Sequence, residues 1–152
     1  MKRVMILLLL TAAVCASAVL TAACGAGDDT DYEHLRDVSW EGTELTIMLG
    51  ENQSTGCEWT TRPEDDSVIG YSLHRVFHLA GSQVTEGNAI GTLEAGFEGK
   101  GAGTSRIICT TPVGWDGTGA GLTYIVTVTV NEDGTIESAE GVESETPPAD
   151  EN

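Results

Sequence analysis

Cysteine and histidine are the residue types of this 152-residue chain that could support nucleophilic or metal chemistry. A thiolate next to an imidazole is a nucleophile, so Cys57 with one of the histidines is one possible catalytic pair. His74 and His78 are four residues apart, and on a β-strand that spacing separates them by about 13 Å. This is too far for one metal ion, so the sequence predicts no metal site and no cofactor.

The glycine-rich stretch Gly99-Lys100-Gly101-Ala102-Gly103 is superficially similar to a phosphate-binding loop. A phosphate loop needs a helix directly after it, because the amides at the helix N-terminus hold the anion. Residues 105–110 have a β-like composition instead. The stretch therefore indicates a tight turn, and we expect no enzymatic activity from the chain.

The charge balance excludes one class of partner. The chain has 24 acidic and 7 basic residues, a net charge of −17 and a pI of about 4.2. Nucleic acids are bound through clustered lysine and arginine, and a membrane surface attracts a basic face. We therefore expect no nucleic-acid partner and no electrostatic attachment to a membrane.

The N-terminus predicts export. A positive start at residues 1–3 precedes an apolar run that ends in small residues, so residues 1–23 are expected to be a signal peptide. Leu20-Thr21-Ala22-Ala23-Cys24 resembles the lipobox of bacterial lipoproteins, which implies a lipid on Cys24 and attachment to the outer side of the cell membrane. Plain secretion and a retained membrane anchor are the alternatives.

Two cysteines remain for the exported domain. Cys57 and Cys109 both fall on the apolar register of their strands, together with Trp59 and Ile107 respectively. Exported cysteines usually pair, so the sequence favours a Cys57–Cys109 disulfide over a thiol nucleophile.

Alternation of apolar and polar residues indicates an all-β domain. The apolar positions of the proposed strands are Leu45, Ile47 and Leu49; Tyr71, Leu73, Phe77 and Leu79; Leu93, Ala95 and Phe97; Ile107 and Cys109; and Tyr124, Val126, Val128 and Val130. About six or seven strands in a β-sandwich follow from this pattern. The domain is expected over residues 38–136, after a flexible tether at 24–37 and before a disordered acidic tail at 137–152.

The loop at residues 52–59 has more sequence character than a turn requires. Its sequence, Asn-Gln-Ser-Thr-Gly-Cys-Glu-Trp, resembles the Asn-Pro-Thr-Thr-Gly-Tyr-x-Trp signature of the chagasin family of cysteine peptidase inhibitors. Asn52, Thr55, Gly56 and Trp59 match directly, and Ser54 replaces another hydroxyl residue.

Two downstream loops follow in the order that the family has. Residues 87–91, Gly-Asn-Ala-Ile-Gly, are similar to its glycine-rich loop, and residues 111–115, Thr-Pro-Val-Gly-Trp, are similar to its Arg-Pro-Trp loop. The chain departs from the family at Gln53, Cys57, Ile90 and at Val113-Gly114, which replaces Arg-Pro.

The resemblance covers residues 38–130 and implies an immunoglobulin-like β-sandwich that reversibly inhibits papain-like cysteine peptidases. The chain would act as a monomer, attached to the membrane only through its lipid. Thr55 would lie deepest in the active-site cleft, and Trp115 would be an exposed anchor, whereas Asn52 could equally hold its own turn. The residues that would contact the peptidase are Asn52, Gln53, Ser54, Thr55, Gly56, Asn88, Ala89, Ile90, Gly91, Val113, Gly114 and Trp115.

A different class of function stays open. A surface module that binds another envelope protein or a polysaccharide would need equally rigid loops. Trp40, Tyr71 and Trp115 are too dispersed along the sequence to indicate a sugar-binding platform.

Overall fold

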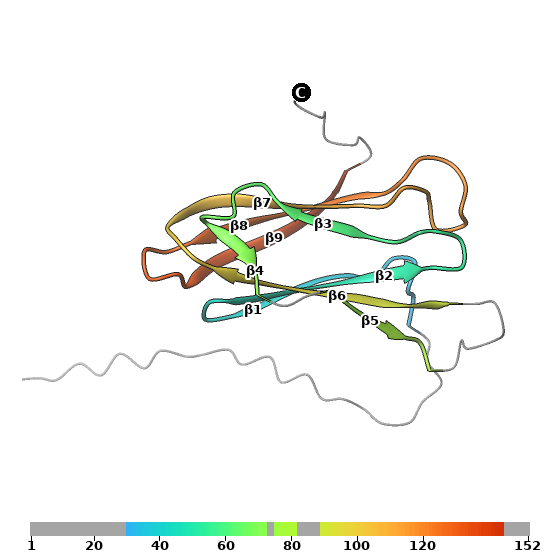
Figure 1. The fold of residues 1–152 in the computed structure, drawn as a ribbon, viewed down its shortest axis with the longest axis horizontal. Coiled ribbons are helices and arrows are strands. Elements are labelled where there is room, and N and C mark those ends of the chain that lie inside the picture. The colour runs from blue at the N-terminus through green and yellow to red at the C-terminus, as the bar shows by residue number, and fades with distance from the viewer. Residues whose placement is uncertain (1–29, 73–74, 82–88, 145–152) are drawn as a thin grey trace, which may run out of the picture.

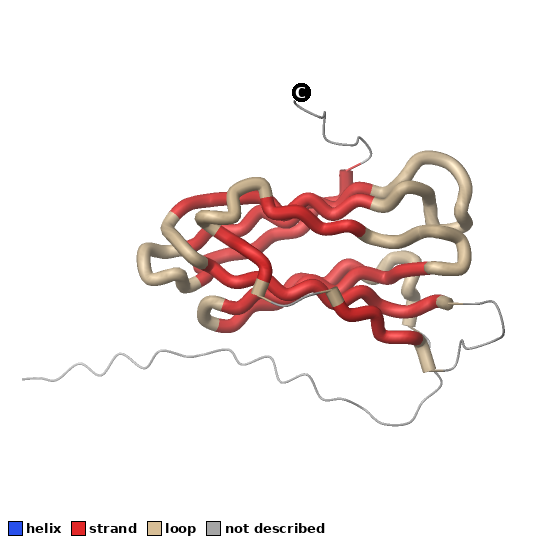
Figure 2. The backbone as a smooth tube through the Cα atoms, in the orientation of Figure 1, coloured by secondary structure: helices blue, strands red, loops and turns tan. Residues whose placement is uncertain are grey.

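The protein is a β-sandwich of two antiparallel sheets (Figures 1 and 2). The computed structural model describes residues 30–72, 75–81 and 89–144, and these residues contain nine strands and no helix. One sheet has the order β1-β2-β6-β4, with β5 also paired to β6, and the other has the order β3-β7-β8-β9. The strands are β1 (Arg36–Glu41), β2 (Glu44–Asn52), β3 (Thr60–Pro63), β4 (Ile69–Tyr71), β5 (Val76–Leu79), β6 (Ile90–Gly99), β7 (Gly103–Thr110), β8 (Thr123–Val130) and β9 (Ile136–Ser144). The expected all-β sandwich is confirmed, with nine strands in place of six or seven.

The core lies between the two sheets and follows the period-two pattern. In β2 and β6, the apolar residues of one strand pair with those of the other, for example Leu45 with Phe97 and Leu49 with Leu93. The opposite sheet contributes the inward side chains of β7 and β8, such as Ile107 and Val126. Alternate side chains of a strand point to opposite faces, so a strand that covers a core on one side must alternate in this way.

The expected strand through Tyr71 and Leu79 is wrong as a single element. The chain forms β4 and β5 instead, and each pairs separately with β6. Tyr71 and Leu79 are 52% and 46% exposed because both strands lie at the open edge of their sheet. Leu73 lies outside the described residues.

Both expected domain boundaries need correction. β1 begins at Arg36, inside the expected tether, and β9 occupies Ile136–Ser144, so disorder is the wrong expectation for residues 137–144. A tight turn over residues 131–134 joins β8 to β9, with Asn131 N donating to Thr135 O at 2.8 Å. Residues 1–23, Cys24 and residues 145–152 lie outside the described residues. Over residues 30–72, 75–81 and 89–144, no helix is long and apolar enough to cross a membrane.

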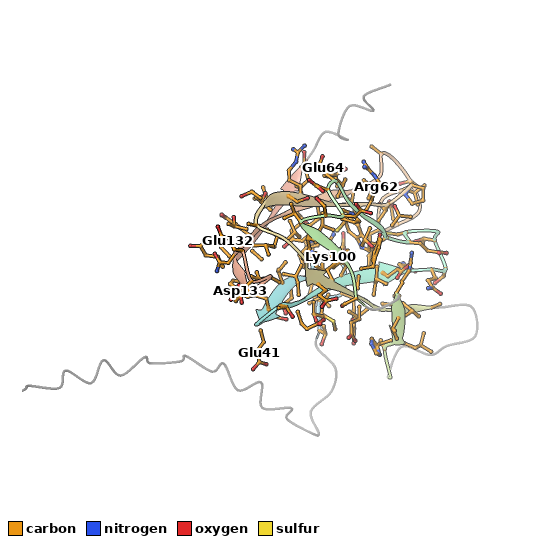
Figure 3. All side chains as sticks on the ribbon, turned by 60° about the vertical axis from the view of Figure 1, so that its left-hand side comes forward. Glu41, Arg62, Glu64, Lys100, Glu132 and Asp133 are labelled. Atoms are coloured by element: carbon orange, nitrogen blue, oxygen red, sulfur yellow. The ribbon has the colours of Figure 1, made fainter. Side chains whose placement is uncertain are left out.

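The strand order brings three loops to one end of the sandwich. Asn52 at the end of β2 pairs with Ile90 at the start of β6, and Thr110 at the end of β7 pairs with Thr123 at the start of β8. The chain segments that follow or precede these residues therefore leave the sheets on the same side, at the right of Figure 1. The turns at the opposite end carry Glu41, Lys100, Glu132 and Asp133 (Figure 3).

Candidate functional site

The first loop, residues 52–57, closes on itself through its main chain. Asn52 N donates to Cys57 O and Cys57 N donates to Asn52 O, each at 3.0 Å. Within this closure, Thr55 N donates to Asn52 O at 3.2 Å and Gly56 N to Gln53 O at 3.3 Å. Gly56 has φ +80°, a conformation that side-chain-bearing residues rarely adopt. The loop is thus a tight turn that its own backbone holds in shape.

The Asn52 side chain holds the loop from inside. Asn52 is 6% exposed, its Oδ1 accepts from Ser54 Oγ at 2.9 Å, and its Nδ2 donates to the Trp115 carbonyl at 3.2 Å. An amide that serves both a donor and an acceptor in this way is committed to its own loops. Of the two roles considered for Asn52, the structure supports the local one.

Thr55 joins the first loop to the third, residues 111–122. The Thr55 hydroxyl lies 2.8 Å from the Trp115 carbonyl oxygen and 3.0 Å from the Asn52 carbonyl oxygen, and both can accept its proton. Gly117 has φ +79°, and a Cβ there would come within 2.9 Å of the Thr55 carbonyl oxygen. Glycine at 117 therefore permits the close approach of the two loops.

The second loop joins β5 to β6 over residues 80–89, of which 80, 81 and 89 are described. Ala89 O accepts from Gln53 N at 2.9 Å, and Ala89 N donates to Ser54 Oγ at 2.9 Å. Asn88 lies outside the described residues. Ile90 and Gly91 belong to β6, where Gly91 is buried and pairs with Glu51 of β2.

Thr111 fixes the base of the third loop. Its hydroxyl donates to Val113 O and accepts from Leu122 N, each at 2.8 Å, and its main-chain N donates to Leu122 O at 3.0 Å. The two ends of a twelve-residue excursion are therefore held together by one buried side chain and its backbone.

A second set of bonds shapes the tip of the third loop. Gly114 N donates to Thr118 O at 3.1 Å, and the Asp116 carboxylate accepts from Thr118 N at 2.9 Å and from its hydroxyl at 2.8 Å. These Thr118 donors lower the pKa of Asp116, because they stabilise its charged form. Trp115 is half-buried and Gly114 is buried, so the tryptophan is less exposed than a projecting anchor would be.

The side chains of the first loop, at the centre of this end, are uncharged and mostly small. Ser54 is exposed, Gln53, Thr55 and Gly56 are half-buried, and residues 52–57 include no charged side chain. Thr55 was expected to project furthest. Its hydroxyl is instead directed at Trp115, and Ser54 is the exposed residue of the first loop.

Below the first loop lies a polar arrangement that sequence reasoning missed. Glu51 is buried, and its carboxylate pairs with the guanidinium of Arg75, which also donates to the Trp59 carbonyl. Trp59 is buried in the core as expected, with Nε1 donating to Gly50 O at 2.7 Å. The one available signal was that Arg75 interrupts the apolar alternation of its segment.

The expected disulfide is not formed. Cys57 and Cys109 are both free and both buried. The main chain of Cys57 pairs with that of Asn52 in an isolated β-bridge at the loop, whereas Cys109 lies within β7 opposite Tyr124. Burial raises the pKa of Cys57 and raises that of Cys109 to about 12, which makes both thiols poor nucleophiles.

The described histidines pair with carboxylates. His34 lies 2.9 Å from Asp31 and His78 lies 2.6 Å from Glu94, while His74 is outside the described residues. In the part of the chain that the structure describes, no group of three or more His, Cys, Asp or Glu side chains is arranged to hold a metal ion.

The arrangement that remains is a tip in which hydrogen bonds join the first loop to the third loop and to Ala89, the described end of the second loop. Comparison of the chain with models of protein families, with curated proteins and with solved structures gave no match.

Proposed function

We propose that this chain is a reversible protein inhibitor of papain-like cysteine peptidases and that its three loops occlude the active-site cleft. The observation that carries the proposal is the hydrogen bonding among the loops. Asn52 and Thr55 bind the Trp115 carbonyl, while Gln53 and Ser54 bind the main chain of Ala89. Segments far apart in sequence are thereby joined into one tip. The similarity of residues 52–59, 87–91 and 111–115 to the chagasin motifs supports the same function.

A papain-like peptidase has its thiolate and imidazole at the bottom of a narrow cleft, so an inhibitor needs a thin and rigid wedge. Ser54 has a small side chain and Gly56 has none, and residues 52–57 include no charged side chain. A loop whose conformation is set before binding loses little entropy in the complex, which favours affinity. The wedge offers no side chain of the kind that fills a substrate pocket, so the peptidase has no correctly placed bond to cleave.

Trp115 contributes differently from the anchor that the resemblance implies. Its carbonyl accepts from both Asn52 and Thr55, and its side chain is half-buried. In the complex, the exposed part of the indole would pack on the rim of the cleft, as aromatic side chains commonly do at interfaces. Trp115 therefore combines an internal role with a smaller contact.

Inhibition by occlusion requires neither a nucleophile nor a metal from this chain. We propose that it acts as a monomer and is not itself an enzyme. The experiment that tests the function is a titration of residues 25–152 against papain and a cathepsin L-like enzyme, with a serine and a metallo peptidase as controls. Inhibition of the first two alone supports the proposal. Full activity of several papain-like enzymes at micromolar concentrations of the folded protein would contradict it and favour a non-inhibitory binding module.

We propose further that the inhibitor is exported and held at the outer side of the cell membrane by a lipid on Cys24. The motif at residues 20–24 supports this location. Palmitate fed to a bacterial host should label the wild type and leave Cys24→Ser unlabelled. An unlabelled wild type released in soluble form would refute the anchor.

A further inference from the structure

A buried carboxylate stands at the entrance of the first loop. Glu51 is the last inward residue of β2 before Asn52, and its side chain has no exposed surface. One carboxylate oxygen, Oε1, pairs with Arg75, and the other, Oε2, has no hydrogen-bond partner. A buried charge of this kind is costly unless it is paired, so Glu51 depends on Arg75.

The Arg75 guanidinium contacts both stems of the first loop. Its Nη2 donates to Glu51, which precedes the loop, and its Nη1 donates to the carbonyl of Trp59, which follows it. The planar guanidinium presents donors in a fixed fork, so it can hold two acceptors at a set separation. Between these stems lies the Asn52–Cys57 pair that closes the loop.

Arg75 also links the first loop to the second. Arg75 directly precedes β5. In that strand, Phe77 pairs with Leu93 of β6 and Leu79 pairs with Gly91. The same two strands, β5 and β6, flank the second loop. One side chain thus connects both stems of the first loop with the strand that leads into the second loop.

We propose that Arg75 is a positioning residue of the inhibitory tip and that its bridge between Glu51 and Trp59 sets the separation of the first-loop stems. This inference rests on the proposed function for its effect on peptidase binding. The bridge itself can be tested in the free protein.

The effect of losing the Arg75 bridge should depend on pH, because it depends on the charge of Glu51. Burial is the largest influence on the pKa of Glu51 and raises it, the charge of Arg75 lowers it, and the charge of Glu58 raises it. The pKa of the Cys57 thiol is also raised, mainly by burial and to a smaller extent by the charge of Glu51. Without Arg75, the pKa of Glu51 must rise further. The carboxyl group is then neutral and tolerated at low pH, but charged and unpaired once the pH passes that raised pKa.

The substitution Arg75→Met removes the charge and keeps much of the side-chain length. We expect R75M to bind papain with an inactivated thiol roughly tenfold or more weakly than wild type at about pH 7.5, and to approach wild type at about pH 5. The double variant E51Q/R75M removes both charges and should bind without this pH dependence. The matched control is R62M, because Arg62 is an exposed arginine of β3 outside the three loops (Figure 3).

Amide hydrogen exchange in the free protein gives the readout that does not need a peptidase. At the higher pH, the amides of Asn52 and Cys57 should exchange faster in R75M than in the wild type at the same pH. At the lower pH, and in the double variant at either pH, their rates should match those of the wild type. If R75M does not fold, E51Q/R75M must restore both folding and slow exchange. Exchange rates in R75M equal to those of the wild type would overturn the proposal. So would a loss of amide protection that is the same at both pH values and is not restored by adding E51Q. Failure of the wild type to bind any peptidase, with the exchange pattern intact, would refute the proposed function alone.

Discussion

The Thr55 hydroxyl donates to the Trp115 main-chain carbonyl at 2.8 Å, although the two residues are 60 positions apart in sequence. Asn52 Nδ2 reaches the same carbonyl at 3.2 Å. A carbonyl oxygen has two lone pairs, so it can accept both bonds. This shared acceptor makes the first and third loops one mechanical unit, and the account of inhibition depends on that unit.

Replacing Thr55 by valine removes the hydroxyl and keeps the shape. We expect Thr55→Val to lower the free energy of unfolding by about 1 kcal/mol, because the Trp115 carbonyl loses one of its donors. Dissociation from papain should be faster, since the loops must be ordered again on binding. Thr55→Ser keeps the hydroxyl and serves as the control. Equal stability and equal dissociation rates for the valine and serine variants would mean that the bond has no influence.

Asp116 gives a pH dependence with a definite sign. Its Thr118 donors lower its pKa from the ordinary value of 3.8, so its contribution to the third loop is present above that value. The contribution is lost as the pH falls through the lowered pKa. The Thr118 amide should therefore exchange slowly in mildly acidic solution and quickly in Asp116→Ala, which should also bind papain more weakly.

The opposite end of the sandwich provides a matched control for Asp116. Asp133 accepts from Thr135 N at 3.0 Å, the same local arrangement in a different turn. Asp133→Ala should accelerate exchange at Thr135 and leave papain binding unchanged. Equal losses of binding from both substitutions would indicate a general effect on the fold.

The buried cysteines should be slow to react. Both are fully buried, and the pKa of Cys109 is about 12, so neither is a thiolate at neutral pH. An alkylating reagent should modify Cys57 and Cys109 only after the domain is unfolded. Fast modification of the native protein would contradict the buried placement. A non-reduced peptide that joins residues 57 and 109 would contradict the free thiols.

Sequence pattern predicted the strands whose side chains alternate clearly, such as β8, and missed β9, in which they do not. β8 alternates valine with threonine, and its inward residues are buried as expected. β9 carries three glutamates, Glu137, Glu140 and Glu143, among its nine residues. Its stability comes from backbone pairing along β8, which composition does not reveal. Acidic side chains are suited to an edge strand because they discourage pairing with a second chain.

The candidate site was predictable in its loops and not in their connections. The residues of the first and third loops could be named because residues 52–59 and 111–115 resemble the chagasin motifs. The bond from Thr55 to Trp115 could not be foreseen, because it depends on how the two sheets stack. Arg75 was visible only as a break in the alternation, and its partner Glu51 looked like an ordinary polar residue at the end of a strand.

The most direct test of the central claim compares papain inhibition by two charge substitutions at opposite ends of the sandwich. Ser54 is the exposed residue of the first loop, and Glu132 lies in an exposed turn at the other end (Figure 3). Ser54→Arg should raise the inhibition constant by roughly 100-fold or more, because the larger side chain collides with the cleft. Ser54→Ala, which keeps the small size, shows how much the Ser54 hydrogen bonds contribute. Glu132→Arg should inhibit within about twofold of the wild type, as expected for a surface change away from the interface. Inhibition that survives Ser54→Arg, or that falls equally in Glu132→Arg, would contradict occlusion of the cleft by the three loops.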